Sequence, residues 1–547
     1  MKYSLLLLIL IQSGVSLAQS TIDTGTISSA AKLMALQFTP AELDSMLDKV
    51  RNSASIYQRM RRLPLLNSEP YPFAFNPAPL GYRVDTVQKK IQWRLISNIS
   101  MPQRKDDLAF YSITQLASLI KGKKISSVQL TRFFLDRLKR WKDTLHCVVN
   151  LTEDIAMKEA AAADEELARG KYRGPLHGIP YGLKDLFSVK GTKTTWGAAP
   201  YRDQIIDEDA FVYTQLHNAG AVLCAKLSMG SLAMGDLWFE GRTKNPWNTA
   251  TGSSGSSAGS ASAVAAGLLP FAIGTETLGS IVSPSATCGL TALRPTFGSI
   301  SRSGAMVLSW SLDKAGPICR SAEDAAIVFN FAKGTDDKDP SAVNRAFNYF
   351  STVNLKKLRI AYPGNYFTGI NKTSPEWAVI EVMKKLGADV KEINFPDSIF
   401  YPFPMVDPII NAESAAAFDD FTRSGLDDQL TGQKKNDWPN GFRASRFIPA
   451  VEYINANRHR YALIKKFFEF MKDYDVIIVP SFGGRQLSIT NLTGNPVVCM
   501  PIGLTERGLP TSITFLGKLY DDATILAVAK AYQDATEFNK IHPKQFE

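Results

Sequence analysis

The stretch that decides the fold reads TGSSGSSAGSAS at residues 251–262 and continues as AVAAGLLPFAI at 263–273. Six of the first twelve residues are Ser and three are Gly, which on its own is typical of a flexible linker. The second run is nearly all apolar and is therefore expected to be buried. It would hold the adjacent Ser/Gly loop at a site shielded from solvent. Hydroxyls and backbone N–H groups held there suit a nucleophile and an oxyanion hole. GTETLGS at 274–280 follows, in which Gly279 allows a substrate to approach the backbone beside Ser280.

A serine nucleophile needs a base, and the five histidines are scattered, so a Ser-His-Asp triad has few candidates. Lys184 offers a second route, because it ends the segment GIPYGLK at 178–184 among apolar and small residues. A desolvated lysine has a lowered pKa and can act as a neutral base. A solvated surface lysine is the competing interpretation of the same residues.

Composition excludes several classes of protein. With 45% hydrophobic and 21% charged residues the chain is neither disordered nor fibrous. The formal net charge is +10, but no block of about five or more like charges predicts a nucleic-acid partner. The cysteines are far apart, and there is no HExxH motif or His/Cys cluster, so we expect no disulfide framework, metal site or cofactor. These cysteines are Cys147, Cys224, Cys288, Cys319 and Cys499.

The N-terminus has the pattern of a secretory signal peptide at residues 1–18. Lys2 precedes a short apolar run, and small residues end at Ala18, so we expect cleavage there and no stable membrane insertion afterwards. The predicted location is exported, either periplasmic or extracellular. Residues 19–105 are expected to form an N-terminal extension, with a helix from Thr39 to about Arg62 and then a Pro-rich strap whose aromatic residues indicate packing; a flexible linker is the alternative.

Residues 106–547 are expected to form the main domain, because helical patterns alternate there with short apolar runs. Residues 340–470 should be a helical region covering one face. This alternation predicts an α/β fold with helices on a mostly buried sheet. The expected helices are 112–121, 126–141 and 152–169, and the expected strands are 221–225, 358–361 and 476–479.

Taken together, these segments resemble the amidase signature family over roughly residues 107–540. The resemblance implies a large, twisted mixed sheet covered by helices, and hydrolysis of an amide carbon–nitrogen bond. The matching segments are LHGIP at 176–180 with Lys184-Asp185, NPWN at 245–248, the loop at 252–260, AVAAG at 263–267, GTETLGSI at 274–281, LRPTFG at 293–298, SLDKAGP at 311–317, TGNPVV at 493–498 and Leu509-Pro510.

The resemblance also implies a Ser–cis-Ser–Lys triad. Lys184 matches the family's base, Ser280 its nucleophile and Ser256 the bridging serine, next to a cis peptide bond. Ser253 and Ser257 are then expected to make hydrogen bonds within the loop. Backbone N–H groups would form the oxyanion hole, namely those of Thr277, Leu278, Gly279 and Ser280.

Three positions depart from the family's usual residues. Glu276, Leu278 and Val282 stand where relatives usually have Asp, Gly and Arg. We therefore expect another arrangement to replace the acid–Arg ion pair of the relatives, and a changed acyl pocket.

Three alternatives remain at this point. Gly255 to Gly259 match G-x-S-x-G, which would make Ser257 the nucleophile of an α/β-hydrolase-type esterase, with His459 or His542 as its base. The chain could instead be a catalytically altered, amidase-like binding protein. The family also includes the amidase component of the transamidosome, which works on charged tRNA, but a signal peptide and the absence of a long basic run favour a free-standing amidase acting on a small-molecule amide. The sequence predicts neither the particular amide nor the oligomeric state.

Overall fold

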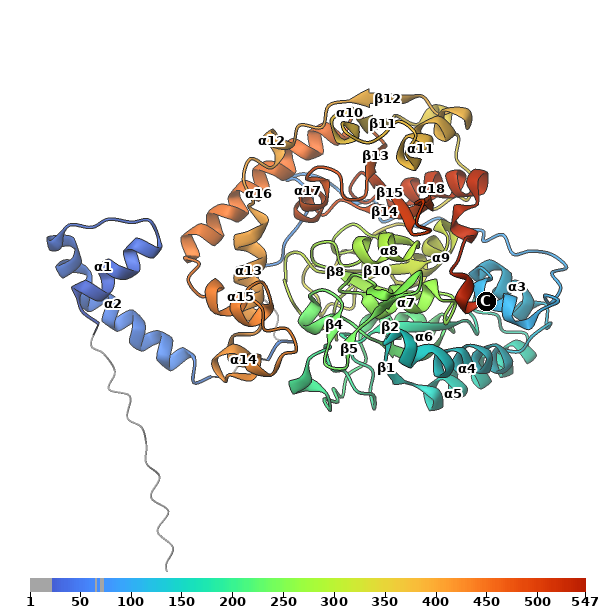
Figure 1. Ribbon diagram of the computed structural model, residues 1–547, viewed down its shortest axis with the longest axis horizontal. Helices are drawn as coiled ribbons and strands as arrows, with labels where there is room; N and C mark the ends of the chain where they lie inside the picture. Colours follow the sequence, from blue (N-terminus) through green and yellow to red (C-terminus); the bar gives the residue numbers. More distant parts are fainter. Residues whose placement is uncertain (1–21, 64–65, 69–72) are drawn as a thin grey trace, which may run out of the picture. The chain divides into compact units, whose positions relative to one another are not determined.

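A computed structural model describes residues 22–63, 66–68 and 73–547, and within them eleven strands form one mixed sheet (Figure 1). The order across the sheet is β1-β3-β2-β8-β10-β9-β14-β15-β13-β11-β12. The strands are β1 (Val148–Leu151), β2 (Pro180–Lys184), β3 (Val222–Leu227), β8 (Ala272–Glu276), β9 (Thr291–Arg294), β10 (Lys314–Cys319), β11 (Ile360–Pro363), β12 (Val390–Ile393), β13 (Val476–Pro480), β14 (Val497–Leu504) and β15 (Pro510–Gly517). Two short hairpins lie beside the sheet, β4 (Leu237–Trp238) with β5 (Gly241–Arg242) and β6 (Lys244–Asn245) with β7 (Asn248–Gly252).

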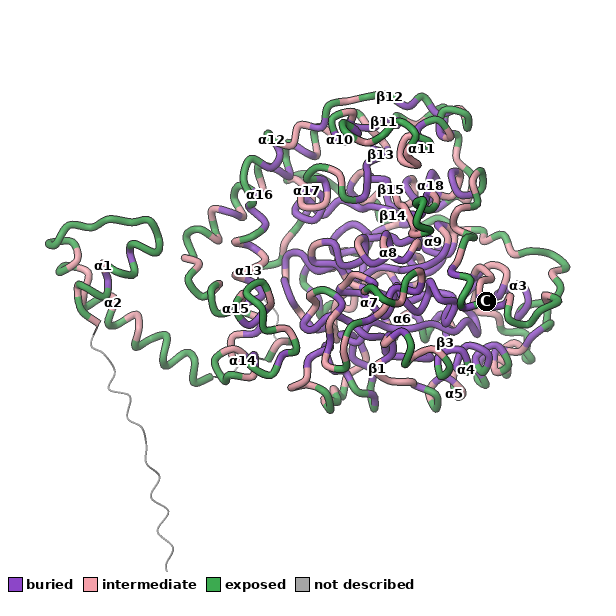
Figure 2. The backbone as a smooth tube through the Cα atoms, viewed as in Figure 1, coloured by how far each residue is buried: buried purple, intermediate pink, exposed green. Residues whose placement is uncertain are grey.

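The sheet contains two groups of parallel strands, and β1 pairs antiparallel with β3 at one edge. β2 runs parallel to β3 and to β8, and β11 runs parallel to β12 and to β13. The strands between these groups pair antiparallel, from β8 through β10, β9, β14 and β15 to β13. The central strands are buried along most of their length (Figure 2), because helices cover the sheet. The predicted α/β fold with a large mixed sheet is confirmed.

The α-helices from residue 113 onward lie before, between and after the strands along the chain. They are α3 (Ile113–Lys121), α4 (Ser127–Leu145), α5 (Glu153–Ala168), α6 (Phe211–Asn218), α7 (Ala258–Ala265), α8 (Val282–Cys288), α9 (Ala322–Ala332), α10 (Gly364–Phe367), α11 (Pro375–Lys385), α12 (Asp397–Phe400), α13 (Val406–Ala417), α14 (Asp419–Arg423), α15 (Trp438–Ser445), α16 (Ala450–Met471), α17 (Gln486–Thr493) and α18 (Asp522–Thr536). Single 3₁₀ turns lie at Lys105–Phe110, Ala199–Tyr201, Ser231–Ala233, Leu355–Lys357, Leu426–Gln429, Phe538–Lys540 and Lys544–Phe546.

The three predicted helices of the main domain are α3, α4 and α5. Ser112 and Ser126 cap α3 and α4, each in a capping box with a glutamine three residues on. α4 runs four residues beyond the predicted end at Trp141, to Leu145, because the apolar face continues to that buried leucine. The predicted strands are β3, β11 and β13, within two residues at each end.

Residues 340–470 contain α10 to α16 and also two strands. β11 and β12 form a parallel pair at the edge of the sheet, with α11 packed against it (Figure 1). This region therefore extends the sheet as well as covering it.

The chain divides into two compact units after Leu65. The smaller unit holds α1 (Thr24–Leu33) and α2 (Pro40–Met60). Thr39 caps α2, as predicted, and forms a capping box with Glu42. The expected signal peptide at residues 1–18 lies outside the described residues.

Residues 64–65 and 69–72 of the predicted strap lie outside the described residues, whereas the segment from Phe73 onward belongs to the larger unit and packs on it through aromatic rings. Phe75 meets Phe297 edge-on at 5.0 Å, Tyr82 stacks on Tyr520 at 5.8 Å, and Trp93 stacks on Tyr349 at 5.7 Å. These ring contacts hold the described part of the segment on the larger unit.

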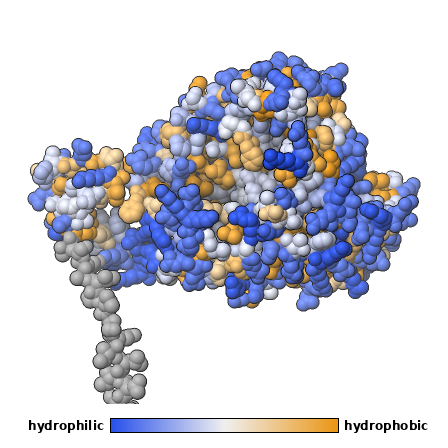
Figure 3. Space-filling view, in the orientation of Figure 1, coloured by the Kyte–Doolittle hydropathy of each residue, from blue (hydrophilic) through white to orange (hydrophobic). Residues whose placement is uncertain are grey.

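No helix among the described residues is long and apolar enough to cross a membrane. Hydrophilic side chains cover much of the face in Figure 3. All five cysteines are described, and each is a buried free thiol. Within the described residues, no group of three or more His, Cys, Asp or Glu side chains is arranged to hold a metal ion.

The close packing of α7 depends on its small residues. A Cβ on Gly259 would lie 2.4 Å from the Cys147 carbonyl oxygen and 2.5 Å from the Ser228 backbone nitrogen. Gly259 thus lets α7 touch the backbone at β1 and β3, and the loop before α7 is held close to the ends of these strands.

We predict that Gly259→Ala lowers the free energy of unfolding by about 1–3 kcal/mol or more, because backbone atoms at both contacts must move. Gly441→Ala in α15 is the matched control, since its new Cβ would meet only the Trp438 ring, at 3.4 Å. Urea denaturation followed by circular dichroism measures both variants. Equal stability of the two would contradict the account of α7.

Candidate active site

Two neighbouring parallel strands bring the predicted site residues together. Lys184 is the last residue of β2, and β8 ends at Glu276, just before the loop that carries Ser280. Because β2 and β8 run side by side, with Leu183 opposite Ile273, their carboxyl ends meet at one edge of the sheet. The loop before α7 reaches the same edge and adds Ser256 and Ser257.

Lys184 is fully buried and surrounded by oxygen atoms. Its Nζ lies 2.8 Å from Ser256 Oγ, 2.8 Å from Thr275 Oγ1, 3.2 Å from Ser257 Oγ and 3.4 Å from the Thr275 carbonyl oxygen. None of these four atoms belongs to a carboxylate. The amine therefore has hydrogen-bond partners but, among the described residues, no counter-charge in direct contact.

This environment changes the proton affinity of the amine. Burial lowers the pKa of Lys184 to about 7, and the negative charges of Asp313 and Glu276 raise it against that effect. A lysine with this pKa is largely neutral at mildly alkaline pH, so its lone pair can accept a proton. The competing interpretation of Lys184 as a solvated surface residue is wrong.

Ser256 makes one of the two contacts that a bridging serine needs, the one to Lys184. The Gly255–Ser256 peptide bond is cis, and the Ser256 side chain points to Lys184 at the distance given above. Ser280 comes next to this segment through its backbone, since its carbonyl oxygen accepts a hydrogen bond from the Ser257 N–H at 3.2 Å. Ser280 is buried, with 8% of its surface exposed. The described contacts include no hydrogen bond between the Ser280 and Ser256 hydroxyls.

Ser257 and Ser253 make loop hydrogen bonds, as expected. Ser257 Oγ donates to the Thr275 carbonyl at 3.0 Å and accepts from the Thr275 N–H at 3.1 Å. Ser253 Oγ donates to the Ser254 carbonyl at 2.9 Å. The two histidines named for an esterase lie elsewhere: His459 packs against Phe403, and His542 stacks on Phe110.

The loop from Thr277 to Ser280 has free backbone donors. Among the described residues, no hydrogen bond is recorded from the N–H groups of Leu278, Gly279 or Ser280. Gly279 has φ +88°, a conformation that favours glycine and turns this backbone sharply. The predicted oxyanion-hole residues thus lie in one turn with donors available.

The Glu276 carboxylate holds the two residues that follow that turn, Ile281 and Val282, through their backbone N–H groups. Its Oε2 accepts from the Ile281 and Val282 N–H groups at 2.9 and 3.0 Å, and its Oε1 contacts Arg294 Nη1 at 2.9 Å and Asn491 Nδ2 at 2.8 Å. Burial alone would raise the pKa of Glu276, but Arg294 and Lys314 bring it down to about 2. The expected replacement for the acid–Arg pair of the relatives is therefore the Glu276–Arg294 pair.

Asp313 and Thr275 were not assigned a role from the sequence, although Asp313 lies in the segment SLDKAGP. The Asp313 carboxylate accepts from Thr277 Oγ1 at 2.6 Å and from the Leu308 N–H at 2.8 Å. Asp313 thus ties the start of the oxyanion loop to residue 308. The match of SLDKAGP to the family was the sequence feature that pointed to Asp313. The sequence could not predict that Asp313 contacts Thr277, which lies 36 residues upstream.

Comparison with known proteins agrees with this geometry. Residues 129–526 match the family model described as Amidase. The glutamyl-tRNA(Gln) amidotransferase of Methylococcus capsulatus has a subunit that is 33% identical to this chain over 478 residues, which cover 79% of this chain and 98% of that protein.

Solved structures give the same assignment. The native peptide amidase from Stenotrophomonas maltophilia is 27% identical, with a TM-score of 0.71 over 79% of this chain and 98% of that one. An amidase family protein from Bacillus anthracis is 25% identical, with a TM-score of 0.70 over 80% of this chain and 93% of that one. The chain belongs to the Amidase family and is a hydrolase that acts on amide carbon–nitrogen bonds.

Proposed function

We propose that this amidase cleaves a small-molecule amide through an acyl-enzyme on Ser280, with Ser256 relaying the proton to neutral Lys184. The observation that carries the proposal is the buried Lys184 amine, 2.8 Å from Ser256 Oγ and with a pKa lowered to about 7. A neutral amine in contact with a hydroxyl is the arrangement that general-base catalysis without histidine requires.

In acylation, Ser280 Oγ attacks the amide carbon while its proton passes to Ser256 Oγ, whose own proton passes to Lys184 Nζ. The developing oxyanion is stabilised by backbone N–H groups between Thr277 and Ser280. The proton then returns along the same path to the leaving amine, and the carbon–nitrogen bond breaks. Water then attacks the acyl-enzyme ester, its proton passes along the same relay and returns to Ser280 Oγ, and the carboxylic acid is released. The relay requires the Ser280 hydroxyl to turn toward Ser256, a contact that substrate binding can tighten.

Ser280→Ala should reduce amide hydrolysis by about 10³-fold or more, because only binding and oxyanion stabilisation remain. Activity is measured on a panel of amides, and labelling by a fluorophosphonate probe is followed by mass spectrometry of the modified peptide. Ser253→Ala is the matched control, since the Ser253 hydroxyl donates to the neighbouring Ser254 carbonyl and the substitution leaves the backbone contacts of Ser253 in place.

Labelling at Ser280 in the wild type would also exclude a binding protein without catalysis. Labelling at Ser257, or full activity in Ser280→Ala, would overturn the assignment.

Activity should depend on pH through Lys184. Because the base must be unprotonated, kcat/KM should rise with pH to a plateau, with its midpoint near the pKa of about 7. Lys184→Arg should be inactive, since a guanidinium keeps its proton in this range. An active arginine variant, or a midpoint near the ordinary lysine value of about 10.4, would place the base elsewhere.

We further propose that the enzyme is exported and works without an amidotransferase complex. Lys2, the short apolar run and Ala18 support the first point. N-terminal sequencing of the protein recovered outside the cytoplasm should begin at Gln19. An uncleaved N-terminus in the cytoplasm would contradict export, and amide hydrolysis only in the presence of partner proteins would favour the role of the amidotransferase relative.

A further inference from the structure

A cavity of about 90 Å³ lies beside the proposed catalytic residues. Thr275 and Thr277, from β8 and the oxyanion loop, form one wall, and Leu186 and Phe187, just after Lys184, form another. Thr275 Oγ1 is 2.8 Å from Lys184 Nζ, so the cavity is one hydrogen bond away from the proposed base. Lys184, Ser256 and Ser280 do not line the cavity themselves, so a substrate group in this space would lie beside Thr275 and Thr277.

Apolar side chains make up much of the remaining wall. Ala233 lies before the cis-serine loop, and Ala305, Met306, Val307 and Leu308 follow one another in the segment between β9 and β10. Met306 and Leu308 are buried. An apolar group that enters here leaves water and gains contacts with these side chains.

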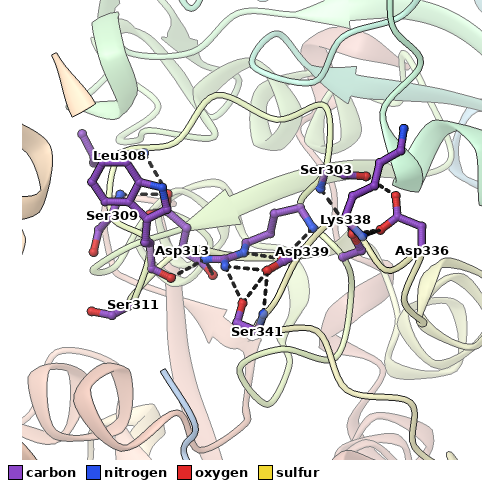
Figure 4. Close-up of polar contacts among 12 residues, drawn as sticks. Ser303, Leu308, Ser309, Ser311, Asp313, Asp336, Lys338, Asp339 and Ser341 are labelled. Carbon is purple, nitrogen blue, oxygen red and sulfur yellow. Dashed lines mark hydrogen bonds and ion pairs between the residues drawn. The ribbon is translucent and has the colours of Figure 1, made fainter. Parts of the chain in front are cut away.

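Arg302 and Asp339 in the wall form an ion pair, whereas the Asp313 carboxylate is held by neutral donors. Arg302 Nε lies 2.8 Å from Asp339 Oδ2, and Arg302 Nη2 lies 3.0 Å from Asp339 Oδ1. Asp313 accepts from Thr277, Leu308 and Ser309, as the dashed contacts at Leu308 and Ser309 in Figure 4 also indicate. Both carboxylates have their hydrogen-bond partners within the protein.

The two lysines in the wall are also accounted for. Lys314 Nζ donates to the Leu312 carbonyl, and burial together with Arg294 lowers the pKa of Lys314 well below its ordinary value. Lys338 Nζ lies 3.6 Å from Glu208 Oε1. A substrate carboxylate would therefore lose its hydration here and, among the described lining residues, meet no cation that lacks a partner.

The N-terminal strap holds this wall in place. Asn67 Nδ2 donates to the Val307 carbonyl at 2.9 Å, and Asn67 Oδ1 accepts from the Val307 N–H at 2.8 Å. Asn67 lies outside residues 129–526, the part of the chain that matches the family model. The shape of the cavity thus depends in part on a segment beyond the family's common region.

We propose that this cavity binds an uncharged, apolar group of the substrate beside the scissile amide, so that the enzyme prefers amides carrying a branched aliphatic or phenyl group. The inference rests on the proposed function, because the cavity is assigned to the substrate by its closeness to Lys184 and Thr277. Asn67 is a positioning residue for the wall at Val307.

Substrate preference tests the proposal in the wild type. Phenylacetamide and isovaleramide should have kcat/KM values about tenfold or more above acetamide, since filling an apolar pocket gives discrimination of this size. Succinamic acid, which carries a carboxylate, should fall below acetamide. Acetanilide places the ring on the amine side, so its rank tells which side of the amide the cavity receives. Equal values throughout, or a preference for succinamic acid, would overturn the proposal.

Two substitutions should change this preference in opposite directions. Ala305→Leu reduces the space and should lower the phenylacetamide-to-isovaleramide ratio several-fold, whereas Met306→Ala enlarges it and should raise the ratio. Ile370→Ala is the control, since Ile370 lines a different hollow, with Pro480 and Leu509. Unchanged ratios in both lining variants, with folding verified by circular dichroism, would overturn the assignment of the cavity.

Binding measured in a variant that lacks the proposed nucleophile tests the cavity proposal separately from the proposed mechanism. In Ser280→Ala, calorimetry should detect phenylacetamide binding, which Ala305→Leu added to that variant should weaken by about tenfold, and no binding of succinamic acid. If fluorophosphonate labels Ser280 but binding shows no apolar preference, only the cavity proposal fails. If the preference is found but Ser280 is not labelled, the proposed nucleophile fails and the cavity stands.

Discussion

The burial of one amine without a carboxylate in contact is the constraint on which the site depends. Lys184 and Lys226 lie on the adjacent strands β2 and β3, and both are fully buried. Lys226 Nζ lies 3.1 Å from Asp185 Oδ1, so it has a counter-charge and serves the structure. Lys184 has, among the described residues, only hydroxyl and carbonyl oxygens within hydrogen-bond distance. The cost of burying an ammonium is therefore offset by an ion pair at Lys226, whereas at Lys184 it lowers the pKa and favours the neutral amine.

Much of the surrounding structure serves to hold hydroxyl groups around that amine. The parallel pairing of β2 and β8 places Lys184 and the oxyanion loop at one edge of the sheet. The small residues of α7 let the cis-serine loop approach the same edge. Glu276, held by Arg294 and Asn491, uses its second oxygen on the Ile281 and Val282 N–H groups, so the preceding N–H groups remain available to a substrate oxygen.

The sequence was sufficient to predict the parts that are local. The Ser/Gly loop with its buried continuation, the starts of α3 and α4 next to Ser112 and Ser126, and the apolar runs of β3 and β13 each depend on neighbours within a few residues. The resemblance to a family then identified Lys184, which lies 72 residues from Ser256 and has no local feature that assigns it a partner. Contacts across the sheet could not be predicted, because they depend on an order of strands that differs from the order along the chain. Glu276 with Arg294, Thr277 with Asp313 and Asn67 with Val307 are of this kind.

The central claim is that Lys184 is neutral where the enzyme works, and direct titration of this side chain tests it without reference to any substrate. Nitrogen NMR of ¹⁵N-lysine-labelled Ser280→Ala protein, with the Lys184 signal assigned by its loss in Lys184→Met, follows the ζ nitrogen as the pH is raised. The account predicts a midpoint near 7, several units below that of the exposed lysines. A midpoint at the ordinary lysine value of about 10.4 would contradict it, because the amine would then be protonated and unable to accept the proton from Ser256.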